Sequence, residues 1–124
     1  MTKRIIISKG TELLRVPADC LMYVSSDGNY SNVVTIDSKS RLVTYQLGQI
    51  EDAINEQLGD EGMIFLRLGR SLIINTEYIY LVDVAKQVLI LSNFRGSFHE
   101  LSASKEVLTK LKAYIESTER TRYD

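Results

Sequence analysis

Short runs of apolar residues, separated by turn-forming residues, dominate the first 46 positions of the chain. β-Branched residues are frequent in these runs, which is typical of strands. Asp27 and Gly28 lie between two of the runs and form a dipeptide suited to the positive φ angles of a two-residue hairpin turn. We therefore predict strands over residues 4–8, 13–16, 21–25, 30–36 and 41–46.

The apolar period changes after this region. Leu47, Ile50, Ile54 and Leu58 stand three or four positions apart, which places them on one face of an α-helix that ends before Gly59. Acidic residues occupy the opposite face. The predicted helix is therefore amphipathic and partly solvated.

A second helical stripe lies near the C-terminus, and Ser104 precedes it as a candidate N-terminal cap. The stripe consists of Val107, Leu108, Leu111, Tyr114 and Ile115. Further strands are predicted over residues 63–68, 72–75, 78–85, 87–91 and 97–101. Because strands and helices do not alternate, the pattern predicts a mostly β, antiparallel fold. We expect one domain over residues 1–118 and a frayed tail over residues 119–124.

The composition is that of an ordinary soluble globule. The 124 residues are 44% apolar and 25% charged, with a formal net charge of −1. The longest apolar run, residues 78–82, is far shorter than the ~20 residues needed to cross a bilayer. No cationic leader with an apolar core opens the sequence, so we expect a cytoplasmic location. The single cysteine, Cys20, excludes an internal disulfide, and we interpret it as a small buried residue.

The sequence offers little for catalysis or metal binding. His99 and Cys20 are the only imidazole and thiol groups, and they are far apart in the chain. No glycine-flanked serine elbow and no phosphate-binding glycine motif is present. The paired carboxylates belong to the predicted acidic helix and its exit, where a solvated surface explains them. We therefore predict no enzymatic activity, no metal site and no cofactor.

Polar residues interrupt the apolar pattern at three turns or element ends, over residues 27–30, 67–71 and 102–105. Such positions commonly carry binding groups, and their hydroxyl, amide and cationic side chains suit phosphate contacts. Arginine adds bidentate recognition of guanine. Taken alone, residues 27–30 are also explained as an ordinary hairpin, residues 67–71 as a pair of surface arginines, and residues 102–105 as a helix cap.

In their order along the chain, four segments between Leu13 and Leu111 resemble the LytTR-type DNA-binding domain, an output domain of bacterial response regulators. The segments are 16–24 (VPADCLMYV), 27–30 (DGNY), 65–75 (FLRLGRSLIIN) and 101–105 (LSASK). The third is the most specific. The resemblance implies an elongated fold of about ten strands in three small antiparallel sheets, with one internal and one C-terminal helix. It also implies loops that enter successive major grooves of DNA.

The resemblance assigns roles to individual residues. Tyr30 takes the hairpin position whose side chain faces DNA. Arg70 takes the contact position of the second loop, and Lys105 takes that of the third. The expected phosphate or positioning partners are Asn29, Ser71 and Ser104.

Some residues depart from the family pattern. Gly69 stands where the family usually has a histidine, and Lys105 replaces the common arginine, which keeps the charge but loses the planar fork. Glu106 would be repelled by phosphate if it faced the groove. Asn75, at the end of the third segment, is expected to be structural.

These expectations give a leading hypothesis and an alternative. The leading hypothesis is a sequence-specific double-stranded DNA-binding transcriptional regulator that recognises repeated sites. Because no receiver domain fits within the chain, we expect control through expression, through a homodimer on DNA or through a separate regulatory protein. The alternative is a protein-interaction module that keeps the LytTR-like fold and binds another regulator through the acidic helix or through Phe94 and Phe98.

The net charge of −1 does not exclude DNA as a partner. Residues 51–61 contain five acidic residues and no basic residue, which leaves 15 basic against 11 acidic residues in the rest of the chain. The charge is therefore segregated. We expect modest contacts through loops, with the acidic helix facing away from the duplex.

Overall fold

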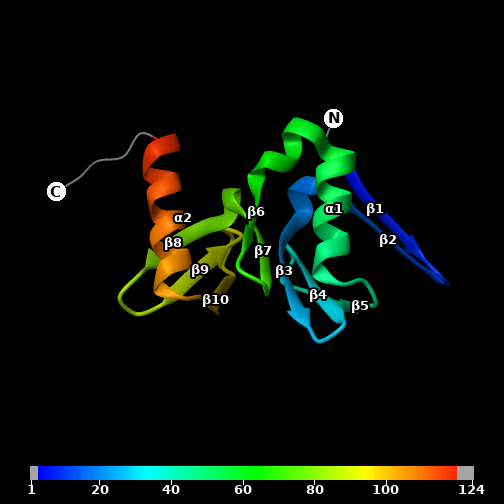
Figure 1. Cartoon of the computed structure of the whole chain (residues 1–124), viewed down its shortest axis with the longest axis horizontal. Helices are drawn as coiled ribbons and strands as arrows, with labels where there is room; N and C mark the ends of the chain where they lie inside the picture. The colour runs from blue at the N-terminus through cyan, green and yellow to red at the C-terminus, as the bar shows by residue number, and fades with distance from the viewer. Residues whose placement is uncertain (1–2, 120–124) are drawn as a thin grey trace. The chain divides into compact units, whose positions relative to one another are not determined.

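The computed structural model describes residues 3–119 and divides the chain into two compact units (Figure 1). The N-terminal unit is Met1–Tyr78 and the C-terminal unit is Ile79–Asp124. Most of the tail expected to fray, residues 120–124, lies outside the described residues. Neither helix in the described part of the chain has the length and apolar character needed to cross a bilayer.

The N-terminal unit contains a two-stranded ribbon, a five-stranded sheet and one α-helix. All strand pairs are antiparallel, and the order in the larger sheet is β5-β4-β3-β7-β6. The ribbon is β1 (Arg4–Lys9) and β2 (Glu12–Pro17). The sheet strands are β3 (Leu21–Asp27), β4 (Tyr30–Thr35), β5 (Ser40–Val43), β6 (Phe65–Leu68) and β7 (Leu72–Asn75). The helix is α1 (Leu47–Leu58), and short 3-10 turns cover Ala18–Cys20, Gly59–Ile64 and Thr76–Tyr78.

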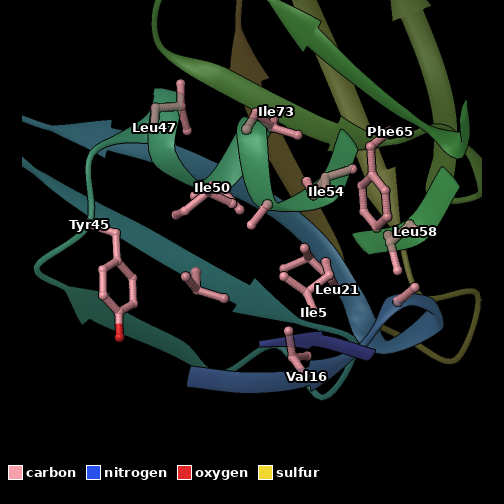
Figure 2. Packing of buried hydrophobic residues seen from close by; sticks show 14 of the residues in the cluster. Ile5, Val16, Leu21, Tyr45, Leu47, Ile50, Ile54, Leu58, Phe65 and Ile73 are labelled. Carbon is pink, nitrogen blue, oxygen red and sulfur yellow. The ribbon is translucent and has the colours of Figure 1, made fainter. Parts of the chain in front are cut away.

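Helix α1 covers one face of the five-stranded sheet and supplies the centre of the core (Figure 2). Its apolar stripe is buried as predicted, with Ile50 and Ile54 facing Ile5 of β1 and Leu21 of β3. Burying each such side chain contributes about 1.5–3 kcal/mol, so this stripe holds the helix, the ribbon and the sheet together.

Two polar side chains attach the ribbon to the rest of the unit. The Gln57 amide of α1 donates to the Ile6 carbonyl at 2.7 Å and accepts from the Ile6 N–H at 2.8 Å, so it satisfies both exposed backbone groups of an edge strand. The buried Tyr45 hydroxyl contacts the carbonyl oxygens of Ile7 at 2.9 Å and Glu12 at 3.1 Å. Burial raises the pKa of Tyr45, and the nearby Glu12 charge adds to the shift.

The C-terminal unit is a three-stranded antiparallel sheet with one helix. Its strands are β8 (Ile79–Asp83), β9 (Val88–Ser92) and β10 (Phe98–Ser102), in the order β10-β9-β8, and its helix is α2 (Lys105–Thr118). Leu89 and Leu91 of β9 are fully buried, as are Leu108 and Leu111 of α2, which contacts β8. The cap is confirmed, because the Ser104 hydroxyl oxygen accepts from the Val107 N–H at 3.2 Å.

The predicted fold class is confirmed, since the described residues form ten strands in three antiparallel sheets with one internal and one C-terminal helix. Several details differ. The strand predicted over residues 41–46 ends at Val43, because the backbone turns there towards the start of α1. Cys20, the last residue of the first 3-10 turn, is half-buried at the edge of the core rather than buried. Tyr114 is 39% exposed and does not belong to the buried stripe of α2.

Asn75 is fully buried and links three parts of the N-terminal unit. Its amide nitrogen donates to the Leu21 carbonyl of β3 at 2.9 Å, and its side-chain oxygen accepts from the Glu77 N–H at 3.0 Å. The side chain therefore fixes the end of β7 to the start of β3, as expected for a structural residue.

We predict that Asn75→Ala lowers the free energy of unfolding by about 1–3 kcal/mol, because the buried Leu21 carbonyl and the part-buried Glu77 N–H lose their side-chain partner. Urea denaturation followed by circular dichroism measures the change. Asn55→Ala, on the exposed face of α1, is the control and should change stability by no more than ~0.5 kcal/mol. Equal stability of the Asn75 variant and the original chain would contradict the structural role.

Candidate nucleic-acid interface

Antiparallel pairing of β3 with β7 brings two of the predicted contact segments together. Tyr23, Val24 and Ser25 of β3 pair with residues of β7, and the Ser26 N–H then donates to the Ser71 carbonyl at 2.9 Å. The β3–β4 hairpin tip over residues 27–30 therefore lies beside the β6–β7 turn over residues 69–71. Both are at the same end of the five-stranded sheet (Figure 1).

The hairpin tip presents an amide and a phenol to solvent. Gly28 has a φ of 62°, the left-handed conformation that the Asp-Gly dipeptide predicted. Asn29 is exposed, and Tyr30 is 47% exposed. Among residues 3–119, no hydrogen bond involves the Tyr30 hydroxyl, so this group is available to a ligand. Asp27, paired with Tyr30 across the hairpin, adds one negative charge to the tip.

The neighbouring turn presents a cation. Gly69 has a φ of 62°, which explains why glycine suits this position, although it supplies no side chain for recognition. Arg70 and Ser71 are exposed, and the Arg70 guanidinium makes no hydrogen bond or salt bridge within the described residues. Arg70 therefore keeps all its donors for an external acceptor.

Arg67 has a different role from Arg70, which the sequence pattern did not reveal. Its guanidinium donates to the carbonyls of Gly69 at 3.1 Å and Arg70 at 3.3 Å, and forms a 2.9 Å salt bridge with Glu51 of α1. The two arginines are therefore not an equivalent surface pair. Arg67 stabilises the β6–β7 turn through these hydrogen bonds, and Arg70 is the exposed cation of the turn. The signal for this role is the strand register, because Arg67 pairs with the core residue Ile73 and so faces α1.

Ser104 and Lys105 lie in the C-terminal unit, at the start of α2. Lys105 is exposed, and its ammonium has no partner among residues 3–119. Glu106 forms an exposed i,i+4 pair with Lys110 at 3.4 Å, which offsets part of the negative charge beside Lys105. The structure thus gathers five of the seven predicted residues at one sheet end of the N-terminal unit and puts two at one helix start of the C-terminal unit.

Lys86 is a further candidate that sequence reasoning missed. It lies in the β8–β9 turn, and the next residue, Gln87, accepts a backbone hydrogen bond from the Ala103 N–H at 3.4 Å. This contact puts the turn beside the segment that carries Ser104 and Lys105. Lys86 is exposed, and its ammonium has no partner in the described part of the chain. The pairing of Val88 with Ser102 is non-local, so local sequence patterns could not identify it.

Comparison with known proteins identifies the family. Residues 11–116 match the family model of the LytTr DNA-binding domain. No curated protein matches the chain. Among solved structures, the fold is similar to the LytTr DNA-binding domain of a Bacillus cereus protein described as a methyl-accepting/DNA response regulator, with a TM-score of 0.55, 17% identity, and coverage of 94% of this chain and 96% of that one. Because the family match spans most of the 124 residues, the chain belongs to the LytTr family of DNA-binding domains.

Proposed function

We propose that this DNA-binding domain is a sequence-specific transcriptional regulator that reads double-stranded DNA through its loops. The single observation that carries the proposal is the pairing of β3 with β7. This pairing is extended by the backbone hydrogen bond between Ser26 and Ser71, and it places two exposed polar turns side by side. A major groove about 12 Å wide admits a two-stranded β-ribbon, so each of the two hairpin ends has a size that the groove accepts.

Arg70 and Tyr30 have the chemistry for base recognition. A free guanidinium donates two parallel hydrogen bonds to O6 and N7 of guanine. The Tyr30 phenol both donates and accepts, and its ring makes apolar contact with a thymine methyl group. Asn29 and Ser71 flank these residues and suit phosphate oxygens, which would fix the register of the turns on the duplex.

Lys105 and Lys86 suit phosphate contacts made by the C-terminal unit. An ammonium is a compact charge without a planar fork, so it binds phosphate well and selects bases poorly. Ser104 uses its oxygen to cap α2, which leaves its hydroxyl proton for an acceptor. In this proposal the N-terminal unit supplies the sequence preference and the C-terminal unit supplies affinity.

We predict that Arg70→Ala weakens binding to the preferred duplex by about 1–3 kcal/mol and relaxes the preference at one base step. Selection from random duplexes identifies the site, and fluorescence anisotropy measures affinity. Arg4→Ala is the matched control, because Arg4 pairs with Pro17 in the ribbon, away from the hairpin tip. Unchanged affinity and base preference in Arg70→Ala would overturn the assignment of Arg70.

We predict that Lys86→Ala and Lys105→Ala each weaken binding about equally on all duplexes and reduce the slope of log K against log salt by ~0.9, because each removes one phosphate contact. Anisotropy titrations at several salt concentrations measure the slope. A loss confined to the preferred duplex would instead assign the lysine to base recognition.

An exposed aromatic cluster favours a second candidate function, binding to another regulator. Tyr80, Phe94 and Phe98 of the C-terminal unit are 56%, 57% and 59% exposed. The Tyr80 ring lies 5.1 Å from that of Phe98 and 6.3 Å from that of Phe94. Grouped exposed rings are common at protein-binding surfaces. An enriched duplex from random selection favours the DNA-reading proposal, whereas persistent failure of selection favours this candidate.

A further inference from the structure

A groove in the N-terminal unit carries positive charge outside the candidate DNA interface. It lies between β2 and the β4–β5 hairpin, and its apolar lining comes from Leu14, Val16 and Val33. Its charged lining includes the cations Arg15, Lys39 and Arg41, all of them exposed. We call these three residues the basic groove.

The cations of the basic groove are only partly offset within the unit, because the Asp37 carboxylate attracts the Lys39 ammonium. None of their side chains forms a hydrogen bond or salt bridge in the described part of the chain. Asp37 is the acid in the groove lining, and its carboxylate is engaged in its own turn, where it accepts from the Thr35 hydroxyl at 2.6 Å and the Lys39 N–H at 3.1 Å. The Thr35 hydrogen bond is the main reason that the pKa of Asp37 is lowered. The groove therefore offers net positive charge to an external anion.

The same unit carries a complementary surface. Asp52 and Glu56 lie four residues apart on α1, so their side chains are neighbours on one face, and Asp60 follows in the next 3-10 turn. We call these three residues the acidic stripe. All three are exposed, and within residues 3–119 none forms a salt bridge or side-chain hydrogen bond. Glu51 and Glu61, by contrast, bind Arg67 and the Lys3 N–H.

We propose that the basic groove of one copy of this chain binds the acidic stripe of a second copy. The lining of the basic groove holds three cations and one carboxylate, Asp37, so it carries a net charge of +2. The acidic stripe carries three carboxylates that form no salt bridge within residues 3–119, so the two surfaces are opposite in charge. Because every copy carries both surfaces, the two surfaces are always present in equal number. The repeated contact joins like molecules head to tail or closes a symmetric pair.

Within the N-terminal unit, the basic groove lies away from the hairpin tip that carries Tyr30. The β4–β5 turn that carries Lys39 is at the opposite end of β4 from Tyr30, and a six-residue strand spans about 17 Å. A second copy bound in the basic groove is therefore not seated on the hairpin tip. This contact would place copies next to each other on a duplex with repeated sites.

Sedimentation velocity of the chain alone, without DNA, tests the proposal. We expect the sedimentation coefficient to rise with protein concentration at ~0.1 M salt and this rise to disappear at ~1 M salt, because the screening length falls from about 10 Å to about 3 Å. A coefficient that does not depend on concentration up to about 1 mM protein at ~0.1 M salt would overturn the proposal.

Charge reversal identifies the surfaces. The groove variant Arg15→Glu/Arg41→Glu and the stripe variant Asp52→Lys/Glu56→Lys should each stay monomeric, because each carries two surfaces of like charge. An equimolar mixture should associate again, because the native stripe of the groove variant meets the native groove of the stripe variant, and the reversed groove meets the reversed stripe. Association of either variant alone, or no association in the mixture, would contradict the pairing.

Two control measurements accompany the charge-reversal variants. Glu100→Lys reverses an exposed charge of the C-terminal unit and should associate as the original chain does. Far-ultraviolet circular dichroism shows whether each variant is folded. If the groove variant loses affinity for a single-site duplex as Arg70→Ala does, the groove binds DNA and the proposed partner is wrong.

Discussion

The β3–β7 pairing is the interaction on which the candidate interface depends. It joins residues 47 to 51 positions apart in sequence, and the Ser26–Ser71 bond extends it beyond the strands to the two turns. Without this register, the β3–β4 tip and the β6–β7 turn would be separate exposed hairpins with no common orientation. With it, the exposed groups of Tyr30 and Arg70 belong to one end of one sheet. The core under α1 supports this arrangement, because Val24 and Ile73 are a cross-strand pair that is buried in it.

Some polar side chains of the candidate interface hold the backbone in place, and others remain unbonded for a ligand. Arg67 uses its donors on two carbonyls of the turn and on Glu51, and Ser104 caps α2. Within residues 3–119, the side chains of Arg70 and Lys105 remain unbonded. A ligand that binds them therefore meets a backbone that is already ordered, which reduces the entropy lost on binding. Helix α1 shows the same division between groups used within the fold and groups left exposed. Its inner face forms the core, and its outer face carries acids that form no salt bridge within residues 3–119.

Local features of the fold were predictable from sequence, and non-local ones were not. The Asp27-Gly28 turn and the stripe from Leu47 to Leu58 depend on neighbours within a few residues, and both were located correctly. The side-by-side arrangement of residues 27–30 and 69–71 depends on strand order, which no local pattern encodes. The contacts of Arg67 with the β6–β7 turn depend on the same kind of non-local pairing. So does the position of the β8–β9 turn, which carries Lys86, beside Ala103. The resemblance to a family supplied the residues of the candidate site, but it did not supply their contacts.

Amide chemical shifts during titration with a duplex that carries a single selected site test the central claim most directly. If the β3–β7 pairing makes one reading surface, the amides of residues 27–30 and 69–71 shift together with a single midpoint. In that case the amides of Asp52 and Glu56 on the outer face of α1 stay unchanged. Shifts in only one of the two turns, two different midpoints, or shifts concentrated on α1 would contradict the account.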